Sequence, residues 1–247
     1  TLDDNVTQSA VRFLVRVDRE LNFEDRKVHE AALYALDSLI RAQYPVGAWP
    51  QRYREFPDPA KFPVKRASYP ETWPRKWPGS NYQAHYTFND NSIIDMIDAM
   101  LEAARVYKDN KYLVSAENGG EFILRAQMPD PQPAWAQQYD AQMHPAWARV
   151  FEPPSVTGGE SQGILRMLMV LYGETGNRRY LEPVPRALDY LRNSILKPEQ
   201  IPDRGRRRAA EPAAGGGDLG NWRRDGGIML ARFYELKTNR PLYVTKG

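Results

Sequence analysis

Two groups of carboxylate and amide side chains stand where this chain could do chemistry. Asp90 and Asn91 end the segment 87–91, and Asp140 ends the segment 135–140. Two carboxylates and an amide oxygen form the hard, oxygen-rich set that Ca²⁺ prefers. The same two carboxylates could instead be the acid and base of a glycoside hydrolase. The chain has no EF-hand spacing, so spacing alone leaves both interpretations open.

Histidine is scarce and cysteine is absent, which narrows the remaining chemistry. His85 stands two residues before the segment 87–91, where it could orient that segment or act as a base. Without cysteine the chain has no disulfide, no zinc–thiolate site and no thiol nucleophile. No serine lies in a nucleophile-elbow pattern, so the sequence does not support a serine hydrolase.

Residues 44–86 are rich in aromatic residues and prolines, and their cationic side chains outnumber the acidic ones. A connection of this length without periodic structure is rare unless it is functional or disordered, and its aromatic content argues against disorder. Aromatic faces with interleaved cations suit a ligand that is both ring-shaped and anionic. Acidic polysaccharide and single-stranded nucleic acid both meet that description. A proline-stiffened flap over the core is the structural alternative.

The elements that would position these groups form an internal repeat. Residues 1–5 match residues 87–91, and residues 157–161 are a looser third copy. A helical hairpin is predicted after each copy, since apolar residues recur at helical spacing over 6–42, 93–126 and 164–196. A threonine with an acid three residues later predicts a helix N-cap at each copy. Beyond the first two hairpins, Trp49, Gln51 and Tyr53 match residues 135, 137 and 139.

Repeated hairpins that each bury one face predict an all-α fold. We expect an α/α toroid, an incomplete barrel with long irregular loops at one mouth, forming a single catalytic domain over 1–247. In a toroid the equivalent mouths bring Asp90 and Asp140 together. A last helix is predicted at 228–236, and residues 204–220 have the composition of a mobile loop.

Several strings resemble polysaccharide lyase family 10, the pectate lyases, in the order in which that family carries them. The strings are Ala42-Gln43-Tyr44-Pro45, Gly47-Ala48-Trp49-Pro50-Gln51, His85-Tyr86-Thr87-Phe88-Asn89-Asp90, Trp135-Ala136-Gln137-Gln138-Tyr139-Asp140, Ala148-Arg149-Val150-Phe151-Glu152-Pro153-Pro154-Ser155, Ala231-Arg232-Phe233-Tyr234-Glu235 and Asn239-Arg240-Pro241. The resemblance implies calcium-dependent β-elimination of de-esterified α-1,4-polygalacturonate, giving 4,5-unsaturated oligogalacturonides. Family members normally begin before Thr1 and continue past Gly247, so we expect flanking segments to be missing here.

The resemblance also assigns roles to residues. Asp90, Asn91 and Asp140 match positions associated with calcium and the substrate carboxylate, and Asp90 is also predicted to be catalytic. The family is thought to use an arginine as base, and Arg149 is our first candidate, with Arg166 and Arg232 in reserve. The predicted substrate-binding residues are Arg240, Arg232, His85, Trp49 and Tyr139. An arginine base is unusual, because guanidinium normally stays protonated.

Two other classes stay open on the residues alone. One is an α/α-toroid glycoside hydrolase that uses Asp90 and Asp140, and the other is a non-catalytic module that binds acidic glycan through residues 44–86. No apolar run approaches the roughly 18 residues of a membrane span, so we expect no membrane contact. The basic residues form no continuous stripe, so we expect no nucleic acid. The lyase prediction implies a secreted or periplasmic monomer, whose signal peptide is not in this chain.

Overall fold

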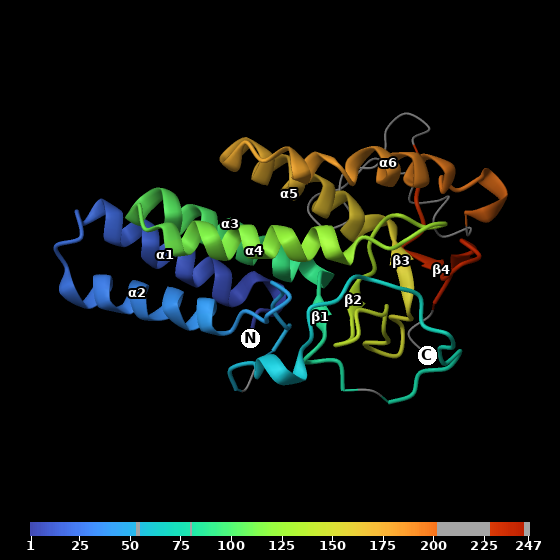
Figure 1. Ribbon diagram of the computed structural model, residues 1–247, viewed down its shortest axis with the longest axis horizontal. Coiled ribbons are helices and arrows are strands. Elements are labelled where there is room, and N and C mark those ends of the chain that lie inside the picture. The colour runs from blue at the N-terminus through green and yellow to red at the C-terminus, as the bar shows by residue number, and fades with distance from the viewer. Residues whose placement is uncertain (53–54, 80, 202–227, 245–247) are drawn as a thin grey trace.

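The computed structural model describes residues 1–52, 55–79, 81–201 and 228–244. Its long helices are α1 (Val6–Glu20), α2 (Arg26–Arg41), α3 (Ser92–Tyr107), α4 (Asn110–Ala126), α5 (Gly158–Thr175) and α6 (Val184–Asn193). They pair as the predicted hairpins, and no helix of the described part is long and apolar enough to cross a bilayer. The all-α prediction is confirmed, and the helices do not close into a barrel (Figure 1).

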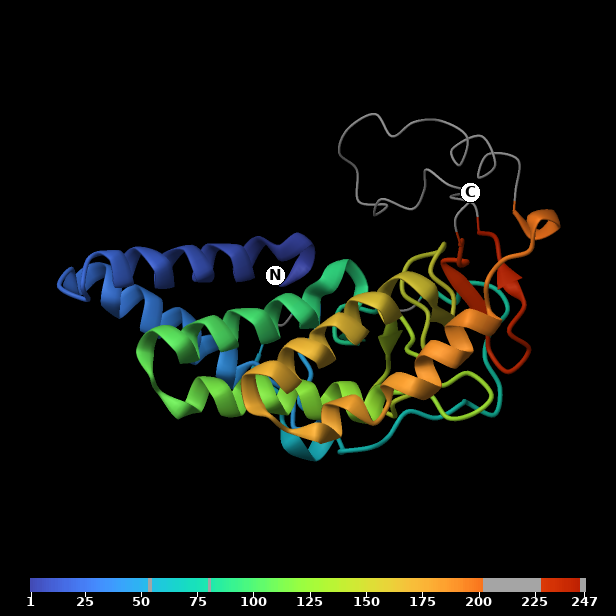
Figure 2. The same cartoon turned by 90° about the horizontal axis from the view of Figure 1, so that it is seen from above.

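The hairpins pack side by side, with α1 against both α2 and α3, and with α5 against α3 and α4 (Figures 1 and 2). The predicted apolar stripes form one core. Val15 of α1, Leu36 of α2 and Ile97 of α3 are at most 1% exposed within it. Two helices have an aspartate N-cap. The Asp25 side chain accepts hydrogen bonds from backbone amides at the start of α2, and the Asp109 side chain accepts one at the start of α4.

Short strands gather at one end of the helices, where the long loops also lie (Figure 1). The antiparallel partners are β1 (Tyr86–Thr87) with β2 (Gln138–Tyr139), and β3 (Ser155–Thr157) with β4 (Phe233–Glu235), which also pairs with β5 (Pro241–Leu242). Both pairs have the same register, since Tyr86 faces Tyr139 and Val156 faces Tyr234. The repeat therefore continues into the strands.

One backbone hydrogen bond recurs in all three repeats. The amide of Leu2 donates to Gln51 O at 2.8 Å, that of Phe88 to Gln137 O at 2.8 Å, and that of Gly158 to Arg232 O at 3.3 Å. Bridges also link successive repeats, because Pro50 pairs with Tyr86 and Ala136 pairs with Val156. Gln51, Gln137 and Arg232 are therefore equivalent positions of the three repeats.

The N-cap prediction is wrong for the first two copies. Asp4 and Asp90 share one left-handed conformation (φ 51°, ψ 32°), and the asparagines that follow have φ 56° and 57°. Aspartate and asparagine tolerate this region better than other side chains. The helices therefore begin only after these residues, and Thr87 lies in β1 instead. Only the third copy places its threonine at a helix N-cap, since Thr157 is the N-cap residue of α5, although its side chain makes no capping hydrogen bond.

The helix predicted at 228–236 is also wrong, since residues 233–235 form β4. Phe233 and Tyr234 pair with Thr157 and Val156 of β3, and a short apolar run does not distinguish a strand from a helix. In the third hairpin, the predicted second helix is split into a 3₁₀ turn at Arg178–Leu181 and α6, with prolines at the start of α6 as expected. The predicted mobile loop at 204–220 lies outside the described residues.

Candidate active site

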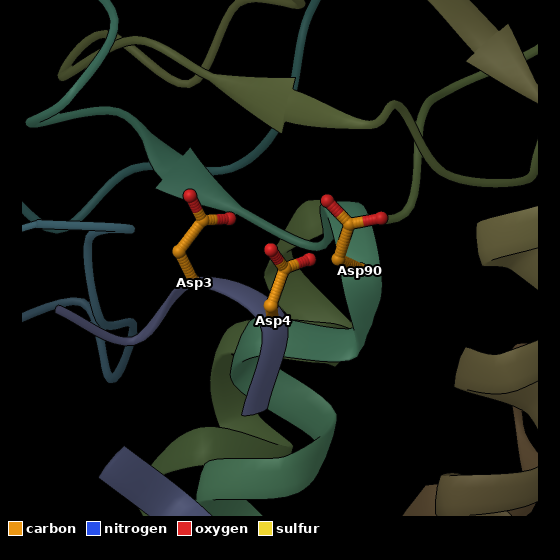
Figure 3. Close-up of side chains that lie close together, drawn as sticks. All are labelled: Asp3, Asp4 and Asp90. Carbon is orange, nitrogen blue, oxygen red and sulfur yellow. The ribbon is translucent and has the colours of Figure 1, made fainter. Parts of the chain in front are cut away.

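Three aspartates from two repeats meet at the loop end of the molecule. Carboxylate oxygens of Asp3, Asp4 and Asp90 all lie within 4.8 Å of one another (Figure 3). The packing of α1 against α3 brings the first two copies of the repeated segment together. The first copy, for which only a helix N-cap was predicted, therefore lies beside Asp90.

The electrostatics of this group favour a cation. Burial raises the pKa of the Asp90 carboxyl, and the negative charge of Asp4 raises it further, whereas Arg149 acts to lower it. Burial raises the pKa of Glu160 in the third copy. The charges of Arg232 and Asp90 also act on this carboxyl, the first lowering its pKa and the second raising it. All three copies thus direct an acid to one region, and their oxygen donors are of the kind that calcium binds.

The other two predicted metal ligands have different surroundings. Asn91 lies next to α5, because its Oδ1 would stand 3.2 Å from a Cβ built on Gly163. Asp140 closes its own turn, where its Oδ1 accepts hydrogen bonds from the amides of Gln142 (2.8 Å) and His144 (3.0 Å). Among the described residues, Asp140 is not one of the carboxylates gathered with Asp90. Its role as a calcium ligand stays a prediction.

The surroundings of His85 favour the neutral form of its ring. Burial lowers the pKa of its imidazole, and the nearby charge of Asp140 opposes that shift only in part. Its buried Nδ1 has no hydrogen-bond partner among the described residues. A neutral imidazole can orient a neighbour or accept a proton, so the substrate-binding prediction for His85 remains open.

A buried glutamate that the sequence did not single out joins two of the predicted arginines. The Glu152 side chain is 1% exposed, and it accepts hydrogen bonds from Arg149 Nε at 2.8 Å and from the Arg149 amide at 3.1 Å. Arg232 Nη2 lies 3.4 Å from Glu152 Oε1. Burial would raise the pKa of Glu152, but the hydrogen bonds and charge of Arg149, with a smaller contribution from Gln137, lower it. Nothing in its proline-rich string distinguishes Glu152 from a surface acid.

The two arginines differ in how firmly they are held. Glu152 engages both edges of the Arg149 guanidinium and raises its pKa, so Arg149 is less able to release a proton than a free arginine. Arg232 makes two longer contacts through Nη2, and its side chain is 52% exposed. The prediction that Arg149 is the base remains untested, and Arg232 is the freer of the two.

Arg240 lies on the β4–β5 hairpin, where its Nε is 3.4 Å from Glu235 Oε2. The same carboxylate accepts hydrogen bonds from Arg75 and from Thr238. The Arg240 side chain is mostly exposed, and its proposed contact with a uronate carboxylate stays a prediction.

Trp49 and Tyr139 are corrected to core residues. Both side chains are 0% exposed. Trp49 Nε1 donates to Leu39 O at 2.9 Å, and the Tyr139 hydroxyl donates to Ala126 O at 2.7 Å. Stacking on a sugar requires an accessible ring face, so neither ring can bind substrate in this conformation. Their recurrence in the repeat reflects packing at equivalent loop ends.

Trp77, an aromatic residue missed as a site candidate, lies on the surface beside Arg149. Its side chain is 45% exposed, and its Nε1 donates to Ala148 O at 2.9 Å. Trp147 Nε1 donates in turn to Pro74 O at 2.9 Å, so the aromatic loop is fixed to the Arg149 loop. The aromatic richness of residues 44–86 pointed to this region, although it did not single out Trp77.

Trp77→Ala should raise KM for an acidic oligosaccharide on the order of tenfold with little change in kcat, because an aromatic stacking contact contributes about 1 kcal/mol. Trp49→Phe is the control that separates surface from core, since it should lower thermal stability and leave KM unchanged. Steady-state kinetics and a melting curve test both variants. An unchanged KM for Trp77→Ala would contradict a role for the Trp77 ring in stacking on a sugar of the substrate.

A small crevice lies between the second copy of the repeated segment and the Arg149 loop. Its lining residues are Gln51, Tyr82, Thr87, Asn89, Gln137, Gln138, Ala148 and Glu152. The crevice therefore joins the equivalent positions of the first two repeats to the buried acid that holds the arginines.

The fold is that of a helical polysaccharide lyase. It is similar to a family 10 polysaccharide lyase from Cellvibrio cellulosa, solved as the mutant D189A in complex with trigalacturonic acid, with a TM-score of 0.68 and 24% identity. That match covers 97% of this chain and 68% of the other. A second structure, described as a family 10 polysaccharide lyase from the same organism, gives a TM-score of 0.64 at 24% identity over the same shares.

The chain belongs to the pectic acid lyase family, whose family model matches residues 1–247. A search of curated proteins gives no match. Family membership confirms the predicted resemblance and identifies the protein as a lyase that acts on pectic polysaccharide.

Proposed function

We propose that this protein cleaves de-esterified α-1,4-polygalacturonate by β-elimination with the help of Ca²⁺. The observation that carries the proposal is the placement of acids from all three repeats beside an arginine pair, in a chain that matches the pectic acid lyase family throughout. A cluster of acids suits a cation, and exposed arginines suit uronate carboxylates.

In the reaction, the C5–H bond breaks, a C4–C5 double bond forms, and the C4–O bond breaks. The proton from C5 passes to a base on the protein, and the leaving O4 takes up a proton. Negative charge develops on the substrate carboxylate as the C5 proton departs, and bound calcium would supply Lewis-acid stabilisation of that charge. The protein must therefore hold the carboxylate and place a proton acceptor near C5.

The carboxylate oxygens of Asp3, Asp4 and Asp90 are ligands of the kind that Ca²⁺ binds. Asp90 is the proposed ligand shared with the substrate carboxylate, and Asp3 and Asp4 lie close enough to contribute. Asn91 and Asp140 stay as proposed ligands from the sequence. Burial and, after it, the charge of Asp4 raise the pKa of Asp90, and a bound cation would oppose both effects by stabilising the ionised carboxylate.

For the base, we propose one of the two arginines that contact Glu152. Arg149 is the candidate from the sequence, but the hydrogen bonds that it donates to Glu152 raise its pKa and so make it harder to deprotonate. Arg232 has fewer constraints and more exposure. The exposed ring of Trp77 would support a neighbouring sugar, beside the Arg149 loop.

An absorbance assay tests the function. Incubation of the protein with polygalacturonate and Ca²⁺ at alkaline pH should give rising ultraviolet absorbance from the unsaturated product, and a chelator should reduce the rate at least tenfold until Ca²⁺ is restored. New reducing ends without unsaturation, insensitive to the chelator, would instead favour the hydrolase. Binding without either signal would favour the non-catalytic module.

We also propose that the protein acts as a secreted or periplasmic monomer, because polymeric pectic substrate lies outside the cell. Size-exclusion chromatography with light scattering should give a mass near the 28.4 kDa of the chain. A stable dimer would contradict the proposed monomer.

A further inference from the structure

Two buried glutamines occupy equivalent positions in the first two repeats. The equivalent backbone hydrogen bonds align Gln51 with Gln137. Gln51 is 3% exposed and Gln137 is 1% exposed, and both line the crevice beside the Arg149 loop. Buried polar side chains are almost always hydrogen-bonded, so the partners of each amide indicate why a polar residue stands there.

Gln51 uses the donor end of its amide. Its Nε2 donates a hydrogen bond to Asp3 Oδ1 at 2.5 Å. Asp3 belongs to the group of three carboxylates proposed to bind calcium, and its other oxygen, Oδ2, lies 3.7 Å from Nη2 of the half-exposed Arg52. Gln51 is therefore a buried, well-packed partner that fixes the direction of the Asp3 carboxylate.

Gln137 uses the acceptor end of its amide. Its Oε1 accepts a hydrogen bond from Arg232 Nη2 at 3.2 Å, and Glu152 Oε1 lies 3.4 Å from the same nitrogen. The Arg232 side chain is 52% exposed, whereas Gln137 and Glu152 are each 1% exposed. Two buried groups therefore hold one edge of a guanidinium that otherwise faces solvent.

A glutamine suits both places because its amide carries donors and an acceptor without a net charge. A carboxylate at position 51 would repel Asp3, and one at position 137 would add a second negative charge beside Glu152. An apolar side chain of the same size would leave the partner group without its hydrogen bond. The neutral amide can thus orient an acid in one repeat and a base in the next.

We propose that Gln51 and Gln137 are positioning residues of the active site, Gln51 for the Asp3 carboxylate and Gln137 for the Arg232 guanidinium. The repeat places one residue type at two equivalent positions, where it orients groups of opposite charge. Both side chains are covered by packing, so they act through the groups that they bind. The inference deepens the proposed function and depends on it for the roles of calcium and of Arg232.

Methionine at position 51 tests the first role, because methionine has nearly the size of glutamine and lacks its hydrogen-bonding groups. Calorimetric titration with Ca²⁺ alone should give a Kd about tenfold higher for Gln51→Met than for the unchanged protein, since loss of a residue that orients a metal ligand typically costs 10–100-fold in affinity. Gln137→Met is the matched control and should change this Kd less than about twofold. A calcium affinity that is equal in Gln51→Met and the unchanged protein, or measurable in neither, would overturn the role of Gln51.

Kinetics on polygalacturonate test the second role. Gln137→Met should lower kcat/KM about tenfold, because a hydrogen bond to a charged group is lost. The change should fall on the same parameter, kcat or KM, that Arg232→Lys changes. In the Arg232→Lys background, Gln137→Met should cost less than about threefold, because lysine lacks the Nη2 group through which Gln137 acts. Gln51→Met should keep its full effect in that background.

Two results would overturn the role of Gln137. One is a cost of Gln137→Met that is as large in the Arg232→Lys background as in the unchanged protein. The other is a loss of thermal stability without any change in kcat or KM. An active lyase whose glutamine variants keep the parent calcium affinity and kinetics would contradict this inference alone. A protein that gives no unsaturated product at all would contradict the proposed function, while the calcium titration would still decide the role of Gln51.

Discussion

Replacing Asp90 with asparagine should lower kcat/KM on polygalacturonate about 100-fold or more. Loss of groups that only support a metal ligand typically costs 10–100-fold, so loss of a direct ligand should cost at least the upper end of that range. Asparagine also tolerates the left-handed backbone of Asp90, and the fold should survive. Steady-state kinetics over a calcium series should show partial recovery at high Ca²⁺, because the variant binds the metal more weakly.

Asp4→Asn is the matched control for this variant. Asp4 has the same backbone conformation as Asp90 and belongs to the same carboxylate group, so each substitution removes one negative charge from one place. If Asp90 is a direct ligand of the substrate-bound metal, Asp4→Asn should cost about tenfold or less. Equal losses would show that Asp90 acts only through the summed charge of the group.

Lysine substitutions at Arg232 and Arg149 should separate the base from a carboxylate-binding arginine. Lysine loses its proton about two pH units below arginine, so a lysine at the base position should move the alkaline rise of kcat to lower pH. Lysine also lacks the fork of donors, so at a binding position it should raise KM and leave the pH profile in place. At either position we expect kcat/KM to fall roughly 100-fold.

We expect Arg232→Lys to shift the pH profile or raise KM more than Arg149→Lys does, since Glu152 holds the Arg149 proton. Arg149→Lys should instead show mainly a loss of thermal stability, because Glu152 is buried and would lose its paired hydrogen bonds. A pH shift confined to Arg149→Lys would restore Arg149 as the base. Arg179→Lys is the control, because Arg179 pairs with Glu121 away from the candidate site. This variant should change neither the pH profile nor KM.

The helices could be predicted from the sequence because their signals are local. Apolar spacing located all three hairpins, and Asp25 and Asp109 mark the starts of two helices. The strands could not be predicted in the same way. The two to three residues of each strand carry no periodic pattern, and β1 to β4 each depend on a partner about 50 to 80 residues away.

The candidate site also combines features that local sequence predicts with contacts that depend on distant segments. The repeated segment pointed to Asp90, and the family strings contained Arg149 and Arg232. The contacts between repeats were not visible: Asp3 and Asp4 join Asp90 only because α1 packs on α3. Trp49 and Tyr139 recur as regularly as the acids do, yet their rings are buried. Recurrence therefore marked equivalent places without distinguishing packing from binding.

The helical class, the threefold repeat and the resemblance to a lyase family can be read along the chain, because they depend on spacing and residue identity. Which copies meet, which side chains stay exposed and which arginine is restrained emerge only in the folded protein. Burial and charge pairing depend on neighbours from distant segments. Glu152 holds two arginines 3 and 80 residues away, and that contact exists only in the folded chain.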